Sequence, residues 1–229
     1  MGFFEFGGAR SDDLGLIVSQ RPNYPAPERL GEVVTIPGRN GTLHVSTGSY
    51  GNVTLPYECW FKGGPARAHA IKEWLLGGEG YSKLSDSYDP EHFRKAQFTG
   101  PQDIENILGQ FGELTIQFDC RPEAFEVQGQ YPTTFSQSGN LYNPTPFPAK
   151  PLIRAYGAGT VKVNGFVCVI NNVDGYVDID CELQQAFKET TDCNNNVSVP
   201  DFPILGAGKN TIVLTGISRI DITPRWWTL

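Results

Sequence analysis

The segment Phe202–Leu214, FPILGAGKNTIVL, places a Gly-Lys pair in a glycine-rich turn and is the first candidate for chemistry in this sequence. A phosphate-binding loop requires Gly-x-x-x-x-Gly-Lys-Ser/Thr, because backbone N–H groups surround the phosphates and the final hydroxyl reaches Mg²⁺. Pro203 stands at the place of the first glycine, and Asn210 at the place of the hydroxyl. The apolar run Ile212–Leu214 that follows predicts a strand. We therefore interpret this segment as a turn between strands.

Few residues are available for catalysis or metal binding by histidine, since the chain has three histidines: His44, His69 and His92. His92 lies in DSYDPEHFRKAQF, near carboxylates that would suit an acid-base pair. These carboxylates belong to Asp86, Asp89 and Glu91. A solvated loop that leads into a strand is the commoner structure for such a segment, and we predict it here. His69 is expected on the polar side of a helix.

The segment INNVDGYVDID is similar to a calcium-binding loop. Aligning Gly175 with the sixth position of such a loop puts Ile170 first and Cys181 twelfth, where oxygen ligands are required. We expect a turn at Asp174–Gly175 instead. Two outward-facing aspartates follow it in a strand: Asp178 and Asp180.

The cysteines are odd in number, widely spaced and nowhere form Cys-x-x-Cys: Cys59, Cys120, Cys168, Cys181 and Cys193. This pattern argues against a zinc site or a disulfide framework and indicates buried free thiols. The adjacent Trp226 and Trp227 could stack on a sugar ring, but we expect one to enter a core and the other to cover apolar surface. The sequence thus predicts no catalytic, cofactor-binding or metal site, no cofactor, and a protein that is not an enzyme.

The composition of the 229 residues is typical of a turn-rich β protein, with 26 glycines, 17 prolines and 12% aromatic residues. The net charge of -7 opposes binding to DNA or anionic lipid. The acidic excess is concentrated up to Gln130, where 11 basic and 17 acidic residues occur, against seven and eight beyond it. There is no leader-like or long apolar segment, so we expect that the chain does not insert into a membrane. We expect it to be synthesised in the cytoplasm.

Hydrophobic periodicity predicts two half-buried strands in the first part of the chain, in Asn52–Lys62 and Glu113–Cys120. Between them, Gly63–Gly78 is predicted to be a helix, because Pro65 suits its first position and glycines end it. Its apolar face comprises Ile71, Trp74 and Leu75.

Residues 129–148 are rich in Pro, Ser, Thr, Asn and Gly without a sustained period, which indicates a linker. Short strands separated by turns follow, and they are typical of a β-sandwich. Their sequences are PLIRAY, TVKVNG, FVCVI, YVDID, NTIVLT and RIDIT. We therefore predict a mainly β chain with an N-terminal domain at 1–130, a linker at 131–150 and a C-terminal β-sandwich at 151–229.

The segment IPGRNGTL, at Ile36–Leu43, carries the strongest signal for a two-residue hairpin turn, Asn40–Gly41. We expect it to join two strands and to present Arg39 at the tip. An exposed hairpin charge and a contact with a neighbouring subunit both fit this arginine.

Short motifs, each a turn or a strand end, follow one another in a specific order from Ser11 to Leu229. They are SDDLGLIVSQRPNYPAPER, IPGRNGTL, the helix with WLL, YSKLSDSYDPEHFRKAQF, LTIQFDCRPEAF, KPLIRAYGAGTVKVNG, VSVPDFPILGAGKNTI and PRWWTL. In this order the chain resembles the distal tail protein of bacteriophages with long, non-contractile tails, the siphophage tail-tip or baseplate hub family. The glycine-rich turn then matches a turn of that family, with Gly206 and Gly208 supplying unusual backbone angles.

The resemblance implies a structural virion protein of the tail tip, a hexameric hub that joins the tail tube to the host-adsorption apparatus. The N-terminal domain would be a ring-forming, β-barrel-like domain with one helix, and the C-terminal domain a galectin-like β-sandwich. The implied partners are the other copies of the homo-hexamer, the tail tube protein, a tail-tip or tail-lysin protein, and receptor-binding proteins. DNA would pass the channel without specific binding, which suits an acidic first domain.

A carbohydrate-binding module that recognises host cell-wall glycans stays open as an alternative, with Trp226 and Trp227 as its stacking residues. A hydrolase is a further class, for which the sequence offers the least support. A galectin-like fold does not bring sugar binding with it, because fold does not fix function and no His-Asn-Arg set matches a galectin site.

Overall fold

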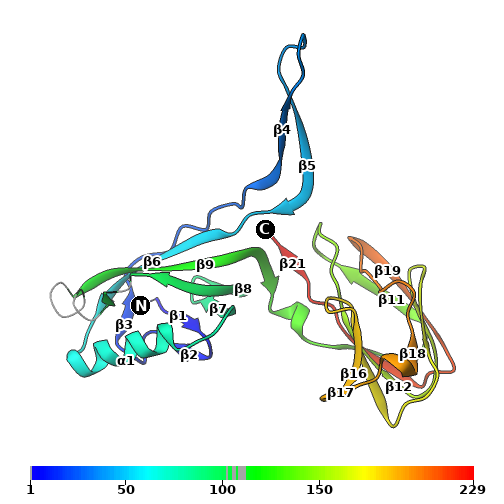
Figure 1. Ribbon diagram of the computed structural model, residues 1–229. Helices are drawn as coiled ribbons and strands as arrows, with labels where there is room; N and C mark the ends of the chain where they lie inside the picture. The colour runs from blue at the N-terminus through cyan, green and yellow to red at the C-terminus, as the bar shows by residue number, and fades with distance from the viewer. Residues whose placement is uncertain (1, 102, 105–106, 108–111) are drawn as a thin grey trace. The chain divides into compact units, whose positions relative to one another are not determined.

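The computed structural model describes residues 2–101, 103–104, 107 and 112–229 of a mainly β chain (Figure 1). The chain divides into two compact units, Met1–Ala124 together with Leu229, and Phe125–Thr228. Each unit has a hydrophobic core of its own. Within the described residues, no helix has the length and apolar character needed to cross a membrane.

The described part of the first unit is built around one antiparallel sheet with the strand order β2-β1-β7-β8-β9-β6-β3. Its strands are β1 (Phe4–Phe6), β2 (Ala9–Arg10), β3 (Leu16–Val18), β6 (Val53–Phe61), β7 (Ser82–Asp86), β8 (Asp89–Gly100) and β9 (Glu113–Glu126). The two strands predicted from periodicity are confirmed as β6 and β9, which pair with each other from Val53↔Cys120 to Trp60↔Glu113. Leu114, Ile116, Phe118 and Cys120 share the buried face of β9, as expected.

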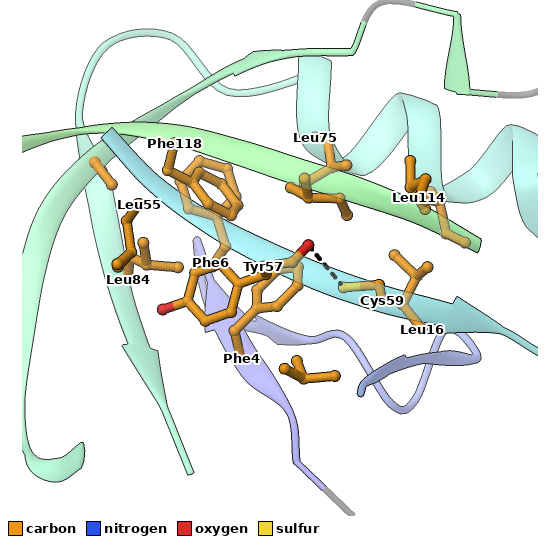
Figure 2. Packing of buried hydrophobic residues seen from close by; sticks show 14 of the residues in the cluster. Phe4, Phe6, Leu16, Leu55, Tyr57, Cys59, Leu75, Leu84, Leu114 and Phe118 are labelled. Atoms are coloured by element: carbon orange, nitrogen blue, oxygen red, sulfur yellow. Dashed lines mark hydrogen bonds between the residues drawn. The ribbon is translucent and has the colours of Figure 1, made fainter. Parts of the chain in front are cut away.

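Aromatic contacts show that this sheet is strongly curled. Strands β1 and β6 are four positions apart in the sheet, which would separate them by about 19 Å if it were flat. The rings of Phe4 and Tyr57, one from each strand, nevertheless have centroids 4.9 Å apart. Phe6 and Phe118 are similarly close at 4.8 Å, and Figure 2 shows these side chains gathered on the inner side. The curl creates the barrel-like core expected for this part of the chain.

Helix α1 (Pro65–Leu76) contributes to the same core, and the helix prediction is confirmed. Pro65 occupies the first turn, and the N–H of Gly77 caps the other end by donating to the carbonyl oxygen of Glu73. Ile71 and Leu75 are buried, and the indole N–H of Trp74 donates to the carbonyl oxygen of Phe6 at 3.0 Å.

The second unit is a sandwich of two antiparallel sheets, as predicted. One has the order β10-β20-β12-β15-β16-β17 and the other β11-β19-β13-β14-β18. The first comprises β10 (Thr133–Phe135), β12 (Leu152–Tyr156), β15 (Tyr176–Asp180), β16 (Gln185–Lys188), β17 (Thr191–Asp192) and β20 (Arg219–Thr223). The second comprises β11 (Gly139–Asn143), β13 (Gly159–Val163), β14 (Phe166–Ile170), β18 (Val197–Ser198) and β19 (Gly208–Thr215). Short 3₁₀ turns η1 (Gln128–Gln130) and η2 (Asn194–Asn196) and the strand β21 (Trp227–Thr228) complete the unit.

Residues 131–150, for which composition indicated a linker, contribute a strand to each sheet of the sandwich. Strand β10 pairs with β20, and β11 pairs with β19 along its whole length. Leu141 and Asn143 of β11 are buried while Tyr142 between them is exposed, so the segment alternates as a half-buried strand does.

Candidate functional site

The glycine-rich turn in 202–214 is held together by Asn210, the residue at the hydroxyl position of a phosphate loop. Asn210 is fully buried, and its Nδ2 donates to the carbonyl oxygens of Gly206 and Gly208, each at 3.0 Å. Its Oδ1 accepts a hydrogen bond from Asn164 at 2.8 Å. The predicted turn is confirmed. Of its two glycines only Gly208, with φ of 76°, has the left-handed backbone that we expected of both.

Asp86, at the end of β7, is the centre of a buried hydrogen-bond network in the first unit. Its carboxylate accepts from the hydroxyls of Tyr24 (2.8 Å) and Tyr57 (2.8 Å) and from the backbone N–H groups of Tyr88 (2.8 Å) and Asp89 (3.1 Å). Burial, and next the charge of Asp86, raise the pKa of Tyr57 well above its usual value. Burial, and next a hydrogen bond to Asp86, also raise the pKa of Tyr24, so both tyrosines stay protonated and act as donors.

His92 lies in strand β8, so the prediction of a solvated loop is wrong here. The turn between β7 and β8 is so tight that Asp86 already pairs with Asp89, and the chain beyond is strand. Nδ1 of His92 is 2.8 Å from Oδ1 of Asp89. The structure thus brings together the side chains of an apparent acid-base cluster. The cavity beside them has a volume of about 20 Å³, which is room for one water molecule and not for a substrate.

Changing Asp86 to asparagine tests whether this network is structural. We expect the free energy of unfolding to fall by about 1–3 kcal/mol, because an amide cannot accept all four hydrogen bonds and leaves buried donors unpaired. Asp89→Asn is the matched control, since the Asp89 side chain is 38% exposed and contacts only the edge of the network. Urea unfolding of both variants provides the measurement. Equal losses would contradict a central role for Asp86.

The calcium-like loop forms the predicted turn at Asp174–Gly175, where Gly175 has φ of 80°, and β15 follows it. Asp178 and Asp180 lie on the face of β15 opposite its core residues, as predicted. They are buried, however, whereas we expected them to be exposed. Arginines cover them: Arg154 makes two hydrogen bonds of 2.8 Å to Asp178, and Arg225 makes two of 2.8 Å to Asp180. These carboxylates serve ion pairs within the sandwich.

The two tryptophans divide as predicted. Trp226 is 6% exposed in the core of the second unit, and Trp227 is half-buried. The ring of Trp227 stacks on Phe147 at 4.5 Å, and its Nε1 donates to the carbonyl oxygen of Pro148 at 2.9 Å. One ring is thus enclosed and a face of the other is covered, so the pair does not form an open platform for a sugar.

The cysteines are free thiols, and four of them are buried: Cys59, Cys120, Cys168 and Cys181. Burial raises the pKa of Cys59, Cys120 and Cys168 to about 12, so these thiols stay protonated and unreactive at neutral pH. His69 lies on the surface of α1, 3.2 Å from Glu73, as expected. Among the described residues, no group of three or more His, Cys, Asp or Glu side chains is arranged to hold a metal ion.

The most conspicuous surface feature of the first unit is a hairpin formed by β4 (Arg29–Thr35) and β5 (Thr42–Tyr50). It forms a two-stranded sheet of its own and extends away from the body of that unit (Figure 1). All of its strand residues except Tyr50 are exposed. The predicted hairpin is confirmed, with Arg39 in the loop. The loop spans 36–41 and is longer than the two-residue turn expected.

The two faces of this hairpin differ in polarity. Register pairs Val34 with Leu43 and Glu32 with Val45, which places three apolar side chains on one face. Val34, Leu43 and Val45 are between 39% and 48% exposed. The opposite face carries Val33 among polar residues: Thr35, Thr42, His44 and Ser46. We call the face of Val34, Leu43 and Val45 the apolar hairpin face. An isolated two-stranded hairpin is marginally stable in water, so this geometry is suited to packing against another surface.

Sequence reasoning identified the hairpin turn but not this face. Part of the signal was present, since Leu43 and Val45 alternate with polar residues in β5, whereas Val34 in β4 directly follows another valine, Val33. Periodicity normally indicates which side faces the core of the same chain, and here no described residue covers that side.

Comparisons with known proteins extend over the whole chain at the level of structure. No family model matches the chain, and no curated protein matches its sequence. The crystal structure of SPP1 Dit (gp 19.1), described as a paradigm of the hub adsorption apparatus in phages that infect Gram-positive bacteria, aligns with a TM-score of 0.75. The two sequences are 15% identical, and the alignment covers 100% of both chains. The mainly β architecture expected from the resemblance is therefore confirmed, and the chain shares its fold with SPP1 Dit from end to end.

Proposed function

We propose that this protein is a structural virion component, a hexameric hub at the distal end of a phage tail. The observation that carries the proposal is the full-length structural match, which includes both units and leaves no part of either chain outside the alignment. A shared fold alone does not fix function. The order of the sequence motifs and the exposed hairpin point independently in the same direction.

The hairpin supports the oligomeric part of the proposal. A hub made of several copies needs a surface that becomes buried on assembly, and the apolar hairpin face is such a surface in the first unit. In this arrangement the first unit forms the ring, and the sandwich unit buries its own core without help. The acidic excess up to Gln130 suits a channel that passes DNA without holding it.

The ends of the ring would meet the tail tube protein on one side and a tail-tip or tail-lysin protein on the other. Receptor-binding proteins are further partners of the same assembly. The role is structural, and no enzymatic step is proposed. The pairing of Asp86, Asp89 and His92 beside a cavity of about 20 Å³ supports this view, because their geometry stabilises the fold without admitting a substrate.

Purified full-length protein tests the proposal directly. We expect light scattering to give the mass of a hexamer and negative-stain electron microscopy to show rings with a central hole. A monomer at all concentrations, with no ring on addition of tail tube protein, would contradict the proposal.

A pair of hairpin variants tests the source of the oligomer. Leu43→Ser with Val45→Ser removes apolar contacts from the apolar hairpin face, and we expect the oligomer to dissociate at least about tenfold more readily, which corresponds to about 1.4 kcal/mol. Val33→Ser is the matched control, because Val33 is 60% exposed on the opposite face. Sedimentation velocity gives the populations. If Val33→Ser weakens the oligomer as much, the apolar hairpin face is not the contact.

A further inference from the structure

The outer face of the five-stranded sheet in the second unit has an unusual set of side chains. Register places Tyr142 beside Lys209, and Lys162 between Val213 on one neighbouring strand and Val167 on the other. The rest of this face consists of Asn140, Thr211, Thr160, Thr215, Val169 and Ser198. We call these residues together the lysine face.

The lysine face carries positive charge that its own chain does not neutralise. None of its residues is an aspartate or a glutamate. Within the part of the chain that the structure describes, neither Lys162 nor Lys209 has an ion-pair partner. This is notable in a protein of net charge -7. Tyr142 is 70% exposed and Val213 is 38% exposed, so apolar surface lies next to the two ammonium groups.

The outer face of the other sheet shows the opposite arrangement. Arg154 is paired with Asp178, and Arg219 with Asp221 at 2.6 Å. The carboxylate of Asp221 also accepts from the hydroxyl of Thr134 at 2.6 Å. These two arginines are therefore paired within the unit, whereas the lysines of the lysine face are left for a partner.

We propose that the lysine face is a docking surface for a protein partner with acidic side chains around an apolar patch. Its carboxylates would pair with Lys162 and Lys209, and its apolar side chains would cover Tyr142 and the valines between them. Tyrosine is typical of the buried centre of such interfaces, and complementary charge gives specificity and speed of association. This docking role goes beyond the hub proposal and does not depend on it.

The charge density and the apolar side chains of the face favour a protein over an anionic polymer. Two hollows of the second unit, about 450 and 410 Å³, are lined by residues in 173–196 and not by the lysine face. A polymer with one phosphate per repeat gains affinity from many cations in a row, and this face offers two. Val167 and Val213, which flank Lys162 on the neighbouring strands, favour a partner with apolar side chains. Such a polymer does not provide them.

The test uses the full-length protein and a fluorescein-labelled peptide that alternates glutamate with valine, followed by fluorescence anisotropy at low ionic strength. We expect binding that weakens with added salt and a Kd at least about tenfold higher for Lys162→Glu with Lys209→Glu. Lys150→Glu is the matched control, since Lys150 is an exposed lysine of the same unit outside these strands, and its Kd should match wild type. Carbodiimide crosslinking followed by mass spectrometry should place the peptide on Lys162 or Lys209.

Three results would overturn the proposal. The first is no binding of the peptide, and the second is an equal loss in Lys150→Glu, which would indicate general attraction only. The third is tighter binding of poly(glycerol phosphate) than of the peptide, which would assign the face to an anionic polymer. Thermal melts of the variants ensure that folding is intact, and Lys162→Gln with Lys209→Gln repeats the comparison without introducing negative charge.

Discussion

Replacing Trp226 by alanine is expected to lower the free energy of unfolding of the second unit by about 3–5 kcal/mol. The indole is 6% exposed and belongs to the core of the sandwich. The backbone around it is also tightly fitted, because a Cβ on Gly129 would lie 2.6 Å from the backbone nitrogen of Trp226. We expect the space that alanine leaves to persist as a cavity. The free energy of unfolding is measured by calorimetry and by urea unfolding monitored with near-ultraviolet circular dichroism.

The adjacent Trp227 is the natural control for this experiment. Trp227→Ala removes a side chain of the same size from the next position, but loses one stacking contact with Phe147 and one hydrogen bond to Pro148. We expect a clearly smaller loss of stability. Equal and small losses in both variants would show that neither ring supports the core, and would restore the pair as a candidate sugar-binding surface.

The ion pair between Asp180 and Arg225 should have an effect of similar size. Asp180→Asn is expected to cost about 3–5 kcal/mol, because it removes both short hydrogen bonds to the Arg225 guanidinium, whose side chain is 20% exposed, and leaves Glu182 at 3.6 Å as its remaining carboxylate partner. Asp180 also accepts from the backbone N–H groups of Glu182 and Leu183, so its charge holds a turn as well as an arginine. Asp174→Asn is the control, since Asp174 is fully exposed and should leave stability unchanged.

The contribution of Asp180 should depend on pH with a defined sign. Burial by itself raises the pKa of Asp180, but hydrogen bonds from Arg225, Leu183 and Glu182 outweigh burial and bring it below the usual value. A carboxylate whose pKa is lower in the folded state stabilises the fold above its unfolded pKa, about 3.9, and loses that contribution as the pH falls through the folded pKa. The difference between wild type and Asp180→Asn should thus be full at neutral pH and shrink below about pH 4. A difference that stays constant down to pH 2 would contradict this assignment.

Local pattern predicted those elements whose core lies within their own part of the chain. The alternation in Glu113–Cys120 and the apolar face of Gly63–Gly78 both point at the core of the first unit, and both became the expected strand and helix. Strands β10 and β11 were missed because their partners, β20 and β19, follow 65 to 89 residues later. Pairing at that distance in sequence, rather than β propensity, holds such short strands in place.

The hairpin loop differed from prediction because of one residue. Pro37 lies two residues beyond the end of β4 at Thr35 and cannot donate to the ladder, so the strands separate before Asn40–Gly41 can form a two-residue turn. Gly38 and Gly41, with φ of 79° and 83°, then carry the longer loop.

The candidate sites show a different limit of sequence reasoning. Composition around His92 indicated a cluster of acids, and the structure does place Asp89 beside it. What the sequence could not supply was the pair of tyrosines from distant segments that satisfy Asp86. The burial of Asp178 and Asp180 was missed for the same reason, since the arginines that cover them come from other strands or from the chain terminus.

The stability of the β4–β5 hairpin depends on what covers it in solution and not on the single chain alone. Its two strands bury little against each other, so whatever covers them supplies the free energy that keeps them extended. By mass action, this stabilisation of the hairpin increases with the concentration of the surface that covers it. Hydrogen exchange in 29–50 should therefore slow as the protein is concentrated, while amides of the sandwich core around Trp226 exchange at a rate independent of concentration.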